Sequence, residues 1–191
     1  NPDQGADARQ LIQRSVDRWI GLEGGHAGYT YTGGCAMLAT LGEGDRAIQT
    51  LDRLKPSITP NTMYREGSPV IETPLSAVES LNYMLLQSWG GTIRVFPAVP
   101  SRWKRASFWK LRTEGAFLVS ARWSDGEVDT IEVHSEAGLD CRVRSPWKGK
   151  SVTVTDSKGD QVSVKRSGDD WIFGTKANTT YKIAPGDTRS K

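Results

Sequence analysis

The spacing of hydrophobic residues changes once along the chain. In the first half they recur every three or four positions, which is the period of an amphipathic α-helix. This spacing predicts helices over residues 7–20, 31–41 and 43–54. A fourth helix is predicted to begin at Thr73 and Pro74, because threonine caps a helix and proline has no amide hydrogen. Its predicted apolar stripe consists of Leu75, Val78, Leu81, Leu85 and Trp89.

After Gly90 and Gly91, hydrophobic and polar residues tend to alternate, which is typical of strands with one buried face. Turn sequences such as Asp125-Gly126 separate these segments. The predicted strands cover residues 93–96, 117–123, 128–133, 139–143, 151–155, 161–165, 171–174 and 180–183. Short strands at this spacing predict an antiparallel β-sandwich.

Helices in one block and strands in the next indicate an α + β protein with two parts, not an alternating α/β sheet. We expect a helical part over residues 1–91 and a β-sandwich over residues 92–191. The helical part contains two long segments without a helical pattern, residues 21–30 and 55–73. Long ordered loops are usually functional, so these segments are the first place to look for a site.

Composition excludes several classes of protein. The 191 residues are 37% hydrophobic and 25% charged, and no apolar run approaches the roughly 20 residues of a membrane span. The net charge of +3 is small, and basic residues do not gather with aromatics, so neither nucleic acid nor membrane is an expected partner. Cys35, Cys141, His26 and His134 lack the spacing of a zinc site. We expect no cofactor or metal, and free buried thiols in preference to a disulfide.

The chain has seven tryptophans, an unusual number for its length. Trp103, Trp109 and Trp123 follow soon after the change of pattern. Because a tryptophan ring has a large apolar area to bury, we expect these three rings to pack between the sandwich and the helices.

The order of several motifs resembles a known family. The run NTMYREGSPVIETPLSAVESLNYMLLQSWGG, residues 61–91, is followed by TIRVFPAVPSRWK and then by LRTEGAFLVSARWSDGEV. This succession resembles the C-terminal region of glycoside hydrolase family 95. The resemblance implies the closing helices of an (α/α)6 barrel followed by a β-sandwich. It also implies an inverting enzyme, secreted or periplasmic, that hydrolyses α-L-fucosides or related glycosides such as L-galactosides.

The resemblance implies a catalytic carboxylate at Glu72, although the family typically has Asp-Gly-Asn-Phe-Gly where this chain has Glu-Thr-Pro-Leu-Ser. A helix N-terminus favours a carboxylate by roughly 0.3–1 kcal/mol, so Glu72 is expected to be ionised and to act as general base. The other interpretation is a solvated carboxylate at a helix entry. The family's general acid belongs to earlier barrel segments, so we expect a partner chain or an N-terminal part of the same enzyme.

Five further residues are candidates for contact with a carbohydrate substrate. Tyr29, Tyr31 and Tyr64 could stack on sugar rings, and Arg65 and Glu66 could bind hydroxyl groups. Core packing is the other interpretation of the tyrosines, and an exposed ion pair that of Arg65 with Glu66. For the whole chain, the alternative to an enzyme part is a non-catalytic carbohydrate-binding or structural module.

Overall fold

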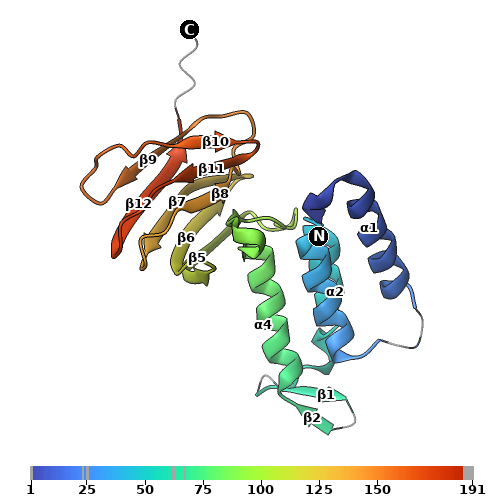
Figure 1. Ribbon diagram of the computed structural model, residues 1–191. Helices are drawn as coiled ribbons and strands as arrows, with labels where there is room; N and C mark the ends of the chain where they lie inside the picture. The colour runs from blue at the N-terminus through green and yellow to red at the C-terminus, as the bar shows by residue number, and fades with distance from the viewer. Residues whose placement is uncertain (1, 23, 25, 62, 67, 187–191) are drawn as a thin grey trace. The chain divides into compact units, whose positions relative to one another are not determined.

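The computed structural model describes residues 2–22, 24, 26–61, 63–66 and 68–186 (Figure 1). It is a mixed α + β protein that divides into two compact units. The helical unit comprises Asn1–Leu85 and Pro97–Arg102, and the β unit comprises Leu86–Phe96 and Trp103–Lys191. The chain therefore leaves the helical unit after Leu85 and returns to it for one short segment.

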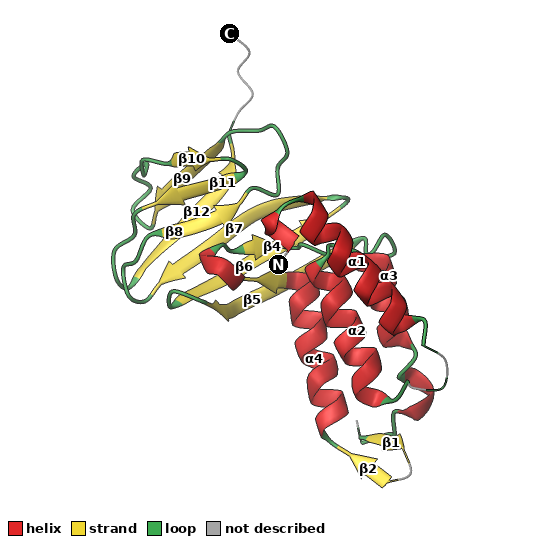
Figure 2. Ribbon diagram, turned by 45° about the vertical axis from the view of Figure 1, so that its right-hand side comes forward, coloured by secondary structure: helices red, strands yellow, loops and turns green. Residues whose placement is uncertain are grey.

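The helical unit is built around a central helix, α2, which contacts each of the other three. Its α-helices are α1 (Ala6–Ile20), α2 (Gly28–Thr40), α3 (Gly44–Asp52) and α4 (Glu72–Leu85). Short 3-10 helices cover Pro2–Gln4 and Lys55–Ser57. A hairpin of β1 (Tyr64–Glu66) and β2 (Ser68–Val70) precedes α4, in a segment that was predicted to be loop. α2 lies beside α4 in both ribbon views (Figures 1 and 2).

The extent of α4 differs from the prediction. The helix begins at Glu72, so that Thr73 is its second residue and not its cap. It ends at Leu85, because Leu86–Gln87 form a strand, β3, that pairs with β4 (Arg94–Val95). The helix is thus shorter than the sequence pattern indicated.

The buried face of α4 was also predicted wrongly. Its buried side chains include Thr73 and Ser80, whereas Leu75 and Val78 are 62% and 57% exposed. The reason is that α4 meets α2 through small polar groups: the Ser80 hydroxyl donates a hydrogen bond of 2.8 Å to the carbonyl of Thr32. Small side chains let the two helices approach closely, and Leu75 and Val78 face outward, while Leu81 and Leu85 are half-buried.

The start of α2 is held at a point of close contact. A Cβ atom at Gly28 would lie 2.5 Å from Oγ1 of Thr73 and 3.0 Å from Cε1 of Tyr64. Real Cβ atoms essentially never come as close as the Thr73 distance, so a side chain at position 28 would require Thr73 to move. Gly28 therefore joins the first turns of α2 and α4 and the strand β1.

The β unit contains two larger antiparallel sheets (Figure 2). The five-stranded sheet has the order β5-β6-β7-β12-β9, and the three-stranded sheet has the order β10-β11-β8. The strands are β5 (Arg105–Thr113), β6 (Phe117–Ser124), β7 (Glu127–Ser135), β8 (Cys141–Arg144), β9 (Val152–Asp156), β10 (Lys165–Ser167), β11 (Asp170–Phe173) and β12 (Thr179–Pro185). The predicted strand over residues 161–165 is wrong, since of these five residues only Lys165 belongs to a strand, β10.

A buried carboxylate joins the segment after β3 to the smaller sheet. Asp170, which is only 6% exposed, accepts hydrogen bonds from Nε of Arg144 at 2.9 Å and from Oγ1 of Thr92 at 3.3 Å. Ile93 continues the connection through a parallel bridge to Val143. A buried charge is tolerated when it is paired and hydrogen-bonded in this way.

Both cysteines are free and buried, as the sequence predicted. Cys35 lies in α2 and donates to the sulfur of Met84 at 3.9 Å, while Cys141 begins β8. Burial raises the pKa of each thiol to about 12. Neither thiol is therefore a nucleophile at neutral pH, because the thiolate is the reactive form.

Replacing Gly28 by alanine tests the close contact at the start of α2. The added methyl group must displace Thr73, so we expect a loss of about 1–3 kcal/mol in the free energy of unfolding. The matched control is Gly33→Ala in the same helix, where the new Cβ would meet Trp19 at an ordinary 3.6 Å. That variant should gain about 0.5–1 kcal/mol from helix propensity. Urea unfolding of both measures the difference, and equal stabilities would contradict the contact.

Candidate functional site

A groove of about 450 Å³ runs between α2 and α4. Both walls carry hydroxyl groups, and aromatic rings lie on each helix. The lining residues are Tyr29, Thr32, Gly33, Ala36, Met37 and Thr40 of α2 and Ser76, Glu79, Ser80 and Tyr83 of α4. A groove with apolar surface and a few polar groups is the usual form of a small-molecule site.

Glu72 stands at the head of the α4 stripe that lines this groove. The residues Glu72, Ser76, Glu79 and Tyr83 follow the spacing i, i+4, i+7 and i+11, which places them on one face of the helix. Glu72 itself is exposed and belongs to the first turn, one turn before the groove lining begins at Ser76. Glu72 is therefore the first residue of α4, at the helix N-terminus.

The contact at Gly28 brings two of the predicted site residues into one neighbourhood. Gly28 packs on Thr73, so the residues that follow and precede them, Tyr29 and Glu72, belong to adjoining first turns. Tyr29 is 56% exposed and lines the groove. The first turns of α2 and α4, which carry Tyr29 and Glu72, thus lie at the same end of the helix pair.

The remaining predicted residues occupy different surroundings. Tyr64 is only 4% exposed and packs beneath Gly28. Arg65 is exposed in the middle of β1, and Glu66 ends this strand with a side chain that lies outside the described residues. Tyr31 is directed toward other partners: its ring centroid lies 6.0 Å from that of His26 and 6.0 Å from the guanidinium carbon of Arg53.

Two carboxylates of the helical unit have lowered pKa values, and both lie away from the groove. The hydrogen bond from Arg102, 2.7 Å long, lowers the pKa of Asp52. The hydrogen bond from Arg46 lowers the pKa of Asp17 in the same way. Glu72 and Glu79, by contrast, form no hydrogen bond or ion pair with any described residue.

Sequence reasoning missed Glu79 and Tyr83, which the structure adds to the groove. The signal was available, since both continue the spacing that starts at Glu72. It was hidden because the apolar stripe of α4 was taken as the buried face. Within the described residues, no cluster of three His, Cys, Asp or Glu side chains could hold a metal ion. None of the described helices is long and apolar enough to cross a bilayer.

Comparisons with solved structures find glycoside hydrolases. One is a family 39 glycoside hydrolase from the gut symbiont Bacteroides cellulosilyticus, with 16% identity, a TM-score of 0.35, and coverage of 43% of this chain and 17% of that chain. Another is the catalytic domain of GH30 xylanase C from Talaromyces cellulolyticus, with 11% identity, a TM-score of 0.30, and coverage of 54% of this chain and 27% of that chain. The chain thus spans well under two thirds of either structure. No curated protein matches significantly.

The sequence profile described as "Glycoside hydrolase family 95, C-terminal domain" matches residues 87–183. This range begins within β3, ends within β12 and covers more than half of the chain. The earlier resemblance rested on motifs on both sides of this boundary, and the profile supports the part that follows Leu86. The chain belongs to glycoside hydrolase family 95 and carries that family's C-terminal domain.

Proposed function

We propose that this chain is the C-terminal part of an inverting glycoside hydrolase that acts on α-L-fucosides or related glycosides. The helical unit supplies one wall of the substrate cleft, and Glu72 is its general base. The observation that supports this proposal is the position of Glu72 at the helix N-terminus that heads the α2–α4 groove. The complete enzyme is proposed to be secreted or periplasmic.

The position of Glu72 suits a base better than an acid. The helix N-terminus carries the equivalent of about half a positive charge, which stabilises a carboxylate. An ionised carboxylate can accept the proton of an attacking water, whereas the proton donor of an inverting glycosidase needs a raised pKa. No described residue pairs with Glu72, so both carboxylate oxygens remain available for a water.

The proton donor comes from outside this groove. Inverting glycosidases separate their two carboxyl groups by roughly 6.5–9.5 Å so that a water fits between sugar and base. Glu79 is seven residues beyond Glu72 on the same helix, a rise of about 10.5 Å. It also points from the same wall, whereas acid and base must act on opposite faces of the sugar. Glu79 therefore has a binding role, and another part of the enzyme supplies the acid.

Aromatic and polar groups of the groove suit the rest of the sugar. Tyr29 and Tyr83 offer ring surface from opposite helices, and Ser76 and Thr40 offer hydroxyl groups. Tyr64, Arg65, Glu66 and Tyr31 remain proposed contacts at the rim formed by β1 and the start of α2. The burial of Tyr64 gives it a second role, because its ring supports the backbone at Gly28.

An exposed apolar stripe supports a larger helical assembly. Ile71, which immediately precedes α4, and Leu75 and Val78 of α4 are 55%, 62% and 57% exposed and follow the spacing i, i+4 and i+7. A barrel helix buries such a stripe against a neighbour. We propose that further helices of an (α/α)6 barrel cover it, and that the two sheets of the β unit form the appended sandwich.

The alternative is a non-catalytic carbohydrate-binding or structural module. The extent of the family match favours it, because residues 87–183 lie in the β unit apart from Pro97–Arg102 and contain neither Glu72 nor the groove. The two functions differ in what Glu72 does, which a single substitution can measure.

The exposed stripe predicts self-association of the isolated chain. Hydrophobic patches without a partner drive association, so the apparent mass in light scattering should rise with protein concentration. A double variant, Leu75→Lys with Val78→Lys, should remain closer to monomeric. Circular dichroism checks that the variant keeps its helices. A monomeric wild-type chain at every concentration would contradict the proposed barrel.

Replacing Glu72 by glutamine in the complete enzyme tests the general base. The amide keeps the shape but cannot accept the proton of water, so turnover should fall about 10²–10⁴-fold. The KM should change much less, because the base acts on water and does not hold the sugar. Added azide should restore part of the turnover. The measurement is steady-state hydrolysis of an aryl α-L-fucoside.

Glu79→Gln is the matched control, since it removes the same charge from the same helix face. A binding residue should raise the KM more than it lowers kcat. Glu66→Gln is expected to behave in the same way. Near-normal turnover of folded Glu72→Gln would refute the base assignment and favour the non-catalytic module.

A further inference from the structure

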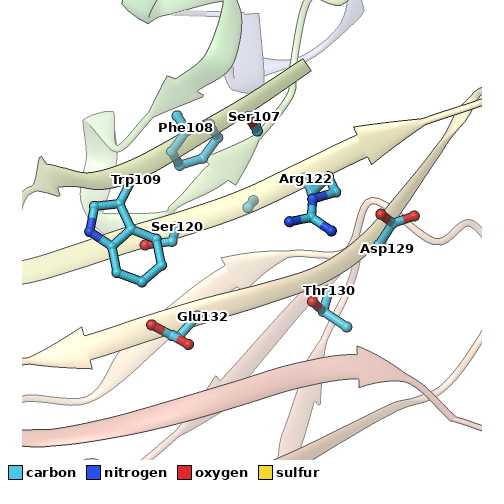
Figure 3. A pocket seen from close by; sticks show the side chains of 9 residues that line it. Ser107, Phe108, Trp109, Ser120, Arg122, Asp129, Thr130 and Glu132 are labelled. Carbon is cyan, nitrogen blue, oxygen red and sulfur yellow. The ribbon is translucent and has the colours of Figure 1, made fainter. Parts of the chain in front are cut away.

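A second cavity of about 450 Å³ lies in the β unit, on the face of the five-stranded sheet that the core does not use (Figure 3). Three adjacent strands, β5, β6 and β7, line it. Trp109 of β5 lies at one side of the cavity and is 68% exposed, which corrects the expectation that its ring would be buried. Arg122 of β6 and Asp129 and Glu132 of β7 supply charged groups around the same hollow.

Irregular pairing in β5 places the Trp109 ring on this face. Phe108 pairs with Ala121 and Leu111 with Val119, so Trp109 and Lys110 both oppose the single residue Ser120. Lys110 has a φ of 51°, a conformation that non-glycine residues rarely adopt. Its backbone N–H donates to the Ser120 hydroxyl at 3.0 Å. A β-bulge of this kind redirects side chains and is common beside functional sites.

A second bulge lies across the hollow, in β7. Asp129 and Thr130 both oppose Arg122, since Ala121 pairs with Ile131 and Trp123 with Val128. The hydroxyl of Ser124 donates to Oδ1 of Asp129 at 2.7 Å and fixes the orientation of that carboxylate. The two bulges therefore border the hollow on either side of β6.

Two charged side chains of the hollow have no partner within the part of the chain that the structure describes. Arg122 and Glu132 form no hydrogen bond or ion pair with any other described residue, although both line the same cavity. Lys110 lies with its Nζ 5.6 Å from the centroid of the Trp109 ring. The Arg122 guanidinium and the Glu132 carboxylate therefore lie around an exposed indole ring with no hydrogen-bond partner among the described residues.

We propose that this hollow, formed by Trp109, Arg122, Asp129 and Glu132, is a non-catalytic binding site for a neutral saccharide. The indole face stacks on the C–H groups of a sugar ring, the Arg122 guanidinium donates to ring or hydroxyl oxygens, and the carboxylates accept from hydroxyl groups. The lining carries two carboxylates against one guanidinium, which disfavours a uronic acid and favours a neutral sugar. No bond is broken here, so the site is independent of the function proposed for Glu72.

The size of the hollow fits a short stretch of a glycan. From β5 to β7 is two strand spacings, about 9.5 Å, and the cavity is within the volume range of small-ligand sites. The site lies on strands, and the two bulges and the Ser124 hydroxyl group fix the positions of its parts. It is therefore formed before a ligand arrives, which limits the entropy lost on binding.

The test is a titration of the whole chain, ¹⁵N-labelled at tryptophan, with cellotetraose, xylotetraose and 2′-fucosyllactose. We expect the indole N–H signal of Trp109, assigned by its loss in Trp109→Ala, to shift with at least one of these neutral sugars. In Trp109→Ala the dissociation constant from isothermal calorimetry should rise about tenfold or more, because the stacking surface is gone. Arg122→Ala should weaken binding as well.

Controls separate this site from the groove. Arg105→Ala removes an exposed arginine of β5, the strand that carries Trp109. Arg105 does not line the hollow, so sugar binding should be unchanged. Glu72→Gln should also leave it unchanged, even if it abolishes turnover of the complete enzyme. No shift of the Trp109 signal at millimolar sugar would overturn the proposal, and so would equal affinity in wild type and Trp109→Ala.

Discussion

The arrangement of the helical unit depends on the absence of one side chain. Gly28 lets the first turn of α2 rest on Thr73 and Tyr64, at distances that a Cβ atom would not permit. This contact joins α2, α4 and the β1 strand, and it brings together the first turns of the two helices, which carry Tyr29 and Glu72. The small hydroxyl residues that follow, Ser76 and Ser80, continue the close approach along α4. The groove is thus a consequence of close helix packing at one end and polar small residues along its length.

The same contact explains the direction of the rest of α4. Because its small polar face is the one that meets α2, Glu79 lines the groove, Glu72 lies one turn before this lining begins, and the stripe of Ile71, Leu75 and Val78 is exposed. In an isolated helical unit that stripe has no cover, while a barrel would bury it. The packing of α4 on α2 therefore accounts both for the proposed catalytic wall and for the proposed partner surface, which occupy adjoining faces of a single helix.

Much of the fold could be predicted from periodicity. The α + β class, the positions of α1 to α3 and the Asp125-Gly126 hairpin are confirmed, since each rests on a strong local signal. The buried face of α4 could not be predicted, because a hydrophobicity pattern assigns leucine to the buried face of a helix. Here the buried face carries Thr73 and Ser80, whose small side chains fit against α2. β5 was missed for a related reason: the bulge at Trp109 and Lys110 interrupts the alternation that marks a strand. Glu72 could be predicted as a site residue from a helix-start signal and a family resemblance. Its grouping with Glu79 and Tyr83 could not, because it depends on which helix packs against α4.

The central claim is that Glu72 activates water at the end of the α2–α4 groove. The most direct measurement is a crystal structure of the complete enzyme, as the Glu72→Gln variant, with an α-L-fucoside bound. The account predicts one water between the residue 72 side chain and the anomeric carbon, and a carboxyl group from another segment roughly 6.5–9.5 Å from residue 72. A sugar bound with its anomeric carbon remote from residue 72 would contradict the account.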